Sequence, residues 1–437
     1  MFVGKIREFI VNFGRAFQSR NYRLFFIGQL VSCTGSQIQA VAMGWLVYDL
    51  TNSKTMLGTI LLLSQAPGLI LSPVAGILMS RFNKRRLLMT VLVLSSLHAL
   101  ILAALTLTGV ITPALLLIMA AFMGILTSLE MPTRHSLIYF MVKEPSHLGN
   151  AIALNSMIFN LGRLVGPAIG GFAISLIKDN WGTALSQGNL PSDVPSHIGE
   201  SFCFFLNSLS YFAAVIALHL MDFVLPVYER GKNAAHDFWE GLKTAWTFPP
   251  VRVVLLTLSM IGATAITANT LTPAIARDIL HGDSRFLGML QSSLALGAII
   301  SAGYMASRST LKYFNYHFIV ATLSSGTGLM IYSYSSSLKL SCFAMFLMGL
   351  GQILLFSSTN TLIQLIAPHK YRDRFISFYA AILLGVVPLG CQLTGFLADH
   401  IGLREAVRIC AICSFLVMIW YLFNRHHIRD HEYPATE

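Results

Sequence analysis

Long apolar runs alternate with short polar segments along the whole chain. A helix of about 20 residues crosses roughly 30 Å of hydrocarbon, and twelve runs are long enough to do so. Inside a bilayer each backbone amide must find a partner within its own segment, so every run is predicted to be helical. The predicted spans are residues 23–48, 55–79, 86–109, 113–134, 149–177, 201–225, 251–276, 286–307, 314–334, 340–366, 374–398 and 404–424.

The composition agrees with an integral membrane protein. The 437-residue chain is 55% hydrophobic and 11% charged, with a mean hydropathy of +0.66, whereas a soluble protein has about 25% charged residues. The net charge of +11 is typical of Lys and Arg gathered in cytoplasmic loops, and no basic run indicates nucleic acid. Cys410-x-x-Cys413 lies in an apolar segment, like the other four cysteines, and is interpreted as packing. Neither a metal nor a cofactor is predicted.

The distribution of Lys and Arg predicts the orientation of the spans. With the N-terminus placed inside, 22 of the 30 Lys and Arg residues lie on the inner side and seven on the outer side, with Arg163 left in the membrane. The positive-inside rule therefore predicts that both termini are cytoplasmic.

The connections between spans predict the domain organisation. Residues 1–22 carry apolar and basic positions at helical spacing, which indicates an amphipathic segment on the membrane surface and not a cleavable signal. The loop 226–250 has aromatic residues at helical spacing and separates two sets of six spans. The predicted parts are 1–22, an N-terminal bundle 23–225, a cytoplasmic linker with an interfacial helix 226–250, a C-terminal bundle 251–424 and a cytoplasmic tail 425–437.

The two halves resemble each other. Gly76-Ile-Leu-Met-Ser80-Arg81 ends the second span, and Gly303-Tyr-Met-Ala-Ser-Arg308 ends the eighth. Short matches between the segment after span four and span ten, and between spans five and eleven, have nearly the same offset. A duplicated six-helix bundle is the architecture with which many secondary transporters build a central site of alternating access.

The fifth span contains Gly162-x-x-x-Gly166-Pro167-x-x-Gly170-Gly171. Glycines at this spacing share one helical face and let another backbone approach closely. The proline removes one helical hydrogen bond and bends the segment. A smooth face beside a bend suits a helix that moves against its neighbour.

These motifs resemble those of major facilitator superfamily transporters. The resemblance implies twelve transmembrane helices in two pseudo-symmetric six-helix bundles. Gly76, Arg81, Lys84 and Arg85 match the family's loop between spans two and three, but Ser80 stands where the family has an acid. The acid's charge network, which the family uses to hold the halves together, is therefore in question here. The glycine and proline pattern of span five is similar to the family's antiporter motif, which implies export.

A narrower resemblance involves Glu130-x-Pro132-x-Arg134 in span four and Asn150-Ala-Ile-Ala-Leu-Asn155 in span five. Together with Pro388-Leu-Gly390 and Gly395-x-Leu-Ala-Asp399 they are similar to the branch that contains the enterobactin exporter and macrolide efflux pumps. The branch handles chemically different compounds, so the resemblance leaves the substrate open. It implies a multi-pass protein of the bacterial inner membrane that acts as a monomer.

Uncharged polar residues within the spans are candidates for a substrate cavity near the midplane. Each could instead hydrogen-bond a neighbouring helix. Gln37 and Asn269 rank first, because spans one and seven line the cavity in proteins that this chain resembles. The candidates are Gln29, Gln37, Gln65, Asn155, Asn269, Gln291, Gln352 and Asn360.

Ionisable residues within the spans are candidates for proton coupling. Arg163 should face a cavity or a partner, since a charge near the bilayer centre costs about 2.5–3.5 kcal/mol; backbone carbonyls would suffice. Glu130 and Arg134 stand at i and i+4, so they form either a local ion pair or a proton site. His98 could carry a proton or lie buried and neutral. The remaining acids are expected at span ends, in contact with water.

A proton-coupled exporter of a small amphiphilic molecule is the leading functional hypothesis. Siderophore export and lysolipid-type transport by the same fold are alternatives. A membrane enzyme is disfavoured, because no pair of His or Asp/Glu stands at metal-ligand spacing inside a span. No phosphate-binding loop of a primary pump occurs in the sequence. A scaffold is disfavoured, because it gives no reason to keep Arg163 and Glu130 inside the membrane. The expected partners are a small-molecule substrate, protons and the lipid bilayer.

Overall fold

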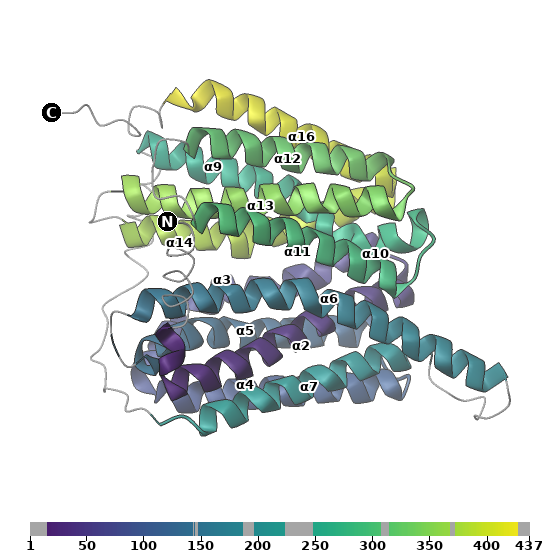
Figure 1. Cartoon of the computed structure of the whole chain (residues 1–437). Coiled ribbons are helices and arrows are strands. Elements are labelled where there is room, and N and C mark those ends of the chain that lie inside the picture. The colour runs from purple at the N-terminus through teal and green to yellow at the C-terminus, as the bar shows by residue number, and fades with distance from the viewer. Residues whose placement is uncertain are drawn as a thin grey trace, which may run out of the picture. The chain divides into compact units, whose positions relative to one another are not determined.

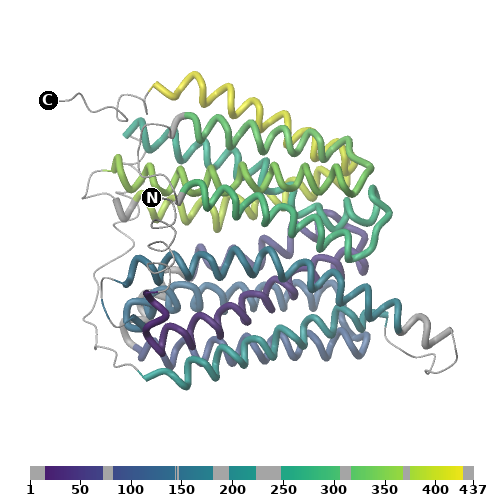
Figure 2. Tube along the Cα trace, in the orientation of Figure 1, coloured from purple at the N-terminus to yellow at the C-terminus, as the bar shows by residue number. Residues whose placement is uncertain are grey.

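The computed structural model describes residues 15–142, 144, 147–186, 196–222, 248–306, 314–367 and 372–426 (Figures 1 and 2). The described residues contain helices and no strands, and each predicted span coincides with helix. The predicted all-helical membrane fold is confirmed. Most of the amphipathic segment 1–22, nearly all of the linker 226–250 and most of the tail 425–437 lie outside the described residues.

Six long helices form the first half of the chain. They are α2 (Arg20–Thr51), α3 (Lys54–Arg81), α4 (Lys84–Leu107), α5 (Pro113–Met141), α6 (Leu148–Ser186) and α7 (Ile198–His219), preceded by the short η1 (Arg15–Gln18).

The second half contains four unbroken spans and two broken ones. The unbroken spans are α11 (Ser284–Ala306), α12 (Phe314–Tyr334), α13 (Leu338–Ile366) and α16 (Leu403–Asn424). The broken ones are α9 (Pro249–Thr264) with η3 (Thr267–Leu271), α10 (Thr272–Ala274) and η4 (Ile275–Ile279), and α14 (Arg372–Ala381) with η6 (Ile382–Val386) and α15 (Val387–Ile401).

Local sequence fixes where the helices begin. The side chain of Asn83 accepts hydrogen bonds from the amides of Arg85 and Arg86 and caps α4. Thr112 caps α5, whose first residue is Pro113. Both caps satisfy amides that a helix start leaves without partners, and proline is favoured at that first position.

Eleven helical segments among the described residues are long and apolar enough to cross a membrane. The remaining predicted span is α12, which is rich in Ser, Thr and Gly. Large apolar side chains stay exposed on the helix surfaces, among them Ile118, Leu176, Phe212 and Leu416. Such side chains are suited to contact with lipid, as expected of a multi-pass membrane protein.

The chain forms two compact units. One holds the described residues of Met1–Leu46 and Ile70–Gly231, and the other those of Val47–Leu69 and Lys232–Glu437. The segment Val47–Leu69, which contains the end of α2 and most of α3, therefore belongs with the helices of the second half.

The breaks in the second half contain one 3-10 turn, η3, and two π-helical turns, η4 and η6. The turn η4 follows Pro273 in α10, and η6 precedes Pro388 in α15. Proline removes a helical hydrogen bond, and single π-turns are frequent at functional sites. The breaks place irregular backbone near Asn269, one of the predicted cavity residues.

Candidate functional site

The glycine face of α6 lies against α2 within the first unit. A side chain at Gly166 would meet the Cβ of Gln37 at 2.5 Å and the carbonyl oxygen of Thr34 at 2.9 Å. Gly162 and Gly170 similarly approach Cys33 and Ile38. The predicted small-residue face therefore permits the close packing of two backbones.

Glu130 and Arg134 form a buried ion pair on α5. Arg134 Nη1 donates to Glu130 Oε1 at 2.9 Å, and the Arg134 and Glu130 side chains are only 6% and 8% exposed, respectively. The guanidinium of Arg134 also stacks over the ring of Phe159, 4.7 Å from its centroid. The i, i+4 spacing positions the pair, and Pro132 lies between its members on the same helix.

A layer of polar side chains joins α2 to α7 in the same unit. Asn207 donates to Gln39 at 2.7 Å, and both side chains are buried. Ser36 hydrogen-bonds the hydroxyl of the buried Tyr211 at 3.1 Å. The layer satisfies these polar groups without water, so it stabilises the packing of α2 on α7.

The other two proton-coupling candidates have different surroundings. Arg163 is exposed and makes no hydrogen bond or ion pair with the residues that the structure describes. His98 is buried, contacts the carbonyl oxygen of Met119 at 3.0 Å through Nε2, and stacks on Phe122.

Two predicted cavity residues contact each other in the second unit. Asn269, in the irregular turn η3, donates to Gln352 of α13 at 3.2 Å. The Asn269 Oδ1 and Gln352 Nε2 atoms are buried and have no hydrogen-bond partner within the described residues. One acceptor and one donor at the break in the helix therefore have no hydrogen-bond partner among the described residues.

The other polar candidates occupy varied positions. Asn155 is buried, and its Oδ1 also lacks a partner among the described residues. Asn360 accepts from Gln364 at 2.8 Å on the same helix. Gln29 is buried, whereas Gln37, Gln65 and Gln291 are half-buried.

The motifs at the ends of spans two and eight are described only in part. Arg85 Nη2 donates to the carbonyl oxygen of His219 at 2.7 Å. Gly303 has open space around it. The side chains at Ser80 and Arg81, the surroundings of Gly76, and Arg308 lie outside the described residues. In span five, Pro167 and Gly171 are buried.

A cluster of charged residues lies where α2 ends and α3 begins, within the second unit. Arg277 donates to Asp49 at 2.7 Å, and the hydroxyl of Tyr48 donates to Asp278. Lys54 Nζ lies 3.9 Å from Asp278 and 3.8 Å from Asp399. The cluster joins a segment of the first half of the sequence to helices of the second half.

Asp399 of α15 caps the start of α3. Its carboxylate accepts hydrogen bonds from the backbone amides of Lys54 and Thr55 and from the hydroxyls of Ser53 and Thr55. A side chain at Gly395 would collide with the backbone of Lys54, so the glycine lets α15 come this close. The expectation that water solvates this acid is incomplete, since its side chain is only 23% exposed.

Sequence reasoning missed this charged cluster. Each acid was considered alone, as a residue at the end of a span. The available signal was the occurrence of both charge signs at the ends of spans one, two, seven and eleven on one side of the predicted membrane.

Comparison with known proteins shows similarity along almost the whole chain. A family model described as transmembrane secretion effector matches residues 15–187 and 192–435. The staphyloferrin A transporter of Staphylococcus aureus is 23% identical over 414 residues, which cover 92% of this chain and 96% of that protein. The multidrug efflux pump Tap of Mycolicibacterium fortuitum is 24% identical over 416 residues, covering 92% and 94%.

A solved structure with a similar fold is that of a bacterial homologue of the human lysosomal transporter Spinster. The match covers 95% of this chain and 98% of the transporter's chain, with a TM-score of 0.69 and 13% sequence identity. At this identity the likeness concerns the fold alone.

Proposed function

Because the chain belongs to the transmembrane secretion effector family of the major facilitator superfamily, and because the relatives described above are transporters and not enzymes, we propose that it is a proton-coupled exporter of a small amphiphilic molecule. The observation that carries the proton coupling is the buried ion pair of Glu130 and Arg134. The names of the relatives support export of small molecules.

The ion pair gives a physical reason for coupling. Protonation of Glu130 removes the counter-charge of Arg134, and an unpaired buried charge costs about 3–5 kcal/mol. Proton binding therefore favours a conformation in which Arg134 meets water, substrate or another acceptor. When Glu130 and Arg134 come together again, the ion pair favours release of the proton from Glu130. The two protonation states of Glu130 therefore prefer different conformations.

The glycine face supplies the means for such a change. Gly162, Gly166 and Gly170 leave the α6 side of the contact with α2 without side chains. A glycine face can slide past a neighbouring helix without first displacing side chains of its own. Arg134 stacks on Phe159 of α6, 4.7 Å from its ring centroid, so a charge change at α5 is close to the glycine face that begins at Gly162.

The substrate contact is assigned to Asn269 and Gln352. The pair carries no charge and offers one acceptor and one donor, which suits a neutral or amphiphilic molecule with few hydrogen-bonding groups. The break in the α9–η3–α10 span is in keeping with transporters, whose discontinuous helices present backbone and side-chain groups to substrate.

Release on the outer side involves the charged cluster. The positive-inside distribution places Asp49, Lys54, Arg277 and Asp399 at the outer ends of their spans. Opening to the outside requires Val47–Leu69 to leave the second-half helices, so these ion pairs and the Asp399 cap act as a latch. The protein is proposed to function as a monomer in the bacterial inner membrane, with both termini in the cytoplasm.

Siderophore export is a second candidate. The similarity to the staphyloferrin A transporter over 96% of that protein supports it. Purified protein in proteoliposomes tests both candidates. An imposed pH gradient should drive accumulation of a fluorescent amphiphile under the first and of a siderophore under the second. Failure to move either compound, with or without the gradient, would contradict the proposed function.

A further inference from the structure

Arg163 places a positive charge at the centre of the fifth span. It lies midway along the predicted span 149–177, about 20 Å from either end. Its side chain is exposed and makes no hydrogen bond or ion pair with the residues that the structure describes. An arginine near the end of a span can extend to the membrane surface, but from the centre of a span the distance is too great. The charge therefore needs water or an anion beside it.

Helix geometry separates Arg163 from the apolar surface of α6. The large apolar side chains that are exposed after Arg163 on this helix are Val165, Ile169, Phe172 and Leu176. Because successive residues are about 100° apart around a helix, these four lie roughly 120–180° away from Arg163. Those four side chains are suited to contact with lipid, so Arg163 stands on the other side of the helix from the lipid-facing surface.

Two further polar residues share the side of α6 on which Arg163 lies. Ser156 and Asn160 precede it by seven and three residues, which places all three within about 60° around the helix. Ser156 is exposed, and its hydroxyl donates to the carbonyl oxygen of Ile152 at 3.2 Å. Asn160 is half-buried, and its side chain makes no hydrogen bond within the described part of the chain. A polar strip about two turns long therefore leads to Arg163.

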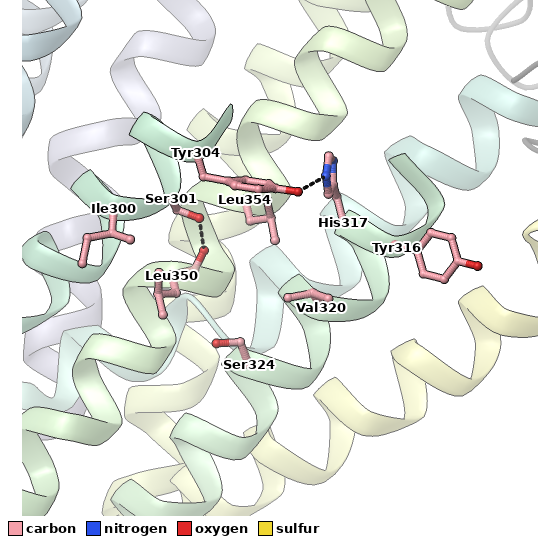
Figure 3. Close-up of a pocket in the computed structure, with 9 residues that line it drawn as sticks. All are labelled: Ile300, Ser301, Tyr304, Tyr316, His317, Val320, Ser324, Leu350 and Leu354. Atoms are coloured by element: carbon pink, nitrogen blue, oxygen red, sulfur yellow. Dashed lines mark hydrogen bonds between the residues drawn. The ribbon is translucent and has the colours of Figure 1, made fainter. Parts of the chain in front are cut away.

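The cavity shown in Figure 3 differs from this strip. It has a volume of about 540 Å³ and lies among α11, α12 and α13 in the second unit. The hydroxyl of Tyr304 lies 3.2 Å from Nε2 of His317, and the hydroxyls of Ser301 and Ser324 donate to helix carbonyl oxygens. The protein itself supplies partners for these groups, whereas Arg163 presents a full charge to its surroundings.

Arg134 and Lys178 are less suited than Arg163 to bind an anion within the membrane. The guanidinium of Arg134 is paired with Glu130 and stacks over Phe159, and its side chain is only 6% exposed. Lys178 is exposed, but it lies one residue beyond the predicted span. Arg163 combines an exposed guanidinium with a position in the middle of its span.

We propose that Arg163 binds an anionic group, a carboxylate or a phosphate, of the molecule that the protein exports. This inference rests on the proposed export function, and it narrows the substrate from an amphiphile in general to one with a negative charge. The planar guanidinium presents donors in a fork that matches two oxygens of a carboxylate or phosphate. An anion at this position neutralises a charge that is costly inside the membrane, so it binds more tightly than an uncharged analogue.

Two fluorescent amphiphiles that differ only in charge test the proposal. Dansyl-phenylalanine has a carboxylate that is ionised at pH 7, and dansyl-phenylalaninamide has the same apolar body without the charge. Dansyl fluorescence gives the dissociation constants for the full-length protein in phosphatidylcholine nanodiscs, where no pH gradient exists. The wild type should bind the carboxylate roughly 10- to 100-fold more tightly than the amide, as expected for hydrogen bonds between charged groups.

Arg163→Gln should remove this preference by weakening the binding of the carboxylate while leaving the binding of the amide nearly unchanged. Arg163→Lys keeps the charge and should keep part of the preference. Lys178→Gln is the matched control, because it removes the same charge from an exposed position of the same helix. Both dissociation constants should be unchanged in this control.

Equal binding of the two probes by the wild type, or no binding of either, would overturn the inference even if a pH gradient still drove export. This comparison needs no variant, so it serves if Arg163→Gln does not fold. A lipid phosphate at Arg163 would also overturn it: Arg163→Gln would then release phosphatidylglycerol in native mass spectrometry and keep the wild-type preference between the probes. A carboxylate preference that depends on Arg163, without accumulation driven by a pH gradient, would support the anion site and contradict the proton coupling.

Discussion

The carboxylate of Asp399 accepts two hydrogen bonds from Thr55, one from the backbone amide at 2.8 Å and one from the hydroxyl at 2.7 Å. The start of a helix leaves amides without partners, and here an acid 344 residues away supplies the acceptor. The cap therefore depends on the tertiary contact between α3 and α15. Any movement that separates these helices must break it.

Asp399→Ala should destabilise this contact more than Asp399→Asn, because asparagine can still cap a helix. Loss of such a cap costs about 0.5–2 kcal/mol, which should lower the melting temperature. Thermal unfolding in detergent measures both variants. Lys339→Ala, at an exposed residue of α13 in the same unit, is the control, and equal melting temperatures for all three variants would count against the cap.

Gly166→Leu should block transport while leaving expression nearly intact. The leucine side chain would have to occupy the space of Gln37 and Thr34, so the face of α6 could no longer pass close to α2. Gly149→Leu on the same helix is the control, because nothing lies within 4 Å of the corresponding Cβ. Normal transport by the Gly166 variant would refute the sliding contact.

Gln352→Ala should raise the substrate KM roughly threefold to tenfold, as expected when one hydrogen bond is removed. Gln364→Ala provides the comparison, since Gln364 is an exposed residue of the same helix that pairs with Asn360. Initial transport rates over a range of substrate concentrations measure both. Identical KM values would remove Gln352 from the substrate site.

Alkaline phosphatase fused after residue 190 should be active, and the same enzyme fused after residue 240 should be inactive. The expectation follows from the distribution of Lys and Arg, which places the first fusion outside and the second in the cytoplasm. The opposite pattern of activities would invert the proposed topology.

Hydropathy was sufficient to place the helices, because the bilayer forces each long apolar run to satisfy its own backbone. It did not reveal the π-turns at Ile275–Ile279 and Ile382–Val386. Pro273 and Pro388 were visible, but whether proline bends, breaks or merely starts a helical piece depends on the neighbouring helices.

Local spacing predicted the partners of Glu130 but not those of Asp399. Glu130 and Arg134 are four residues apart on one helix, so their contact follows from helix geometry. The partners of Asp399 are distant in sequence and reach it only because Gly395 admits the backbone of Lys54.

The surroundings of Arg163 could not be predicted from the free-energy cost of a charge in the bilayer alone. Burial in the membrane was expected to require a partner, yet the side chain is exposed. The glycines at positions 162, 166 and 170 turn toward α2, and the next residue along a helix projects about a quarter turn away from that face. Sequence spacing alone does not indicate which surroundings a side chain in that direction meets.

The most direct test of proton coupling uses Glu130→Gln in proteoliposomes, with wild type and Glu130→Asp measured alongside. Uptake driven by a pH gradient and exchange of labelled for unlabelled substrate without a gradient are recorded for each. The glutamine variant should lose gradient-driven accumulation and keep exchange, because it binds substrate but cannot titrate, whereas the aspartate variant should keep part of both. Accumulation by Glu130→Gln at the wild-type level would contradict the assignment of Glu130 as the coupling acid.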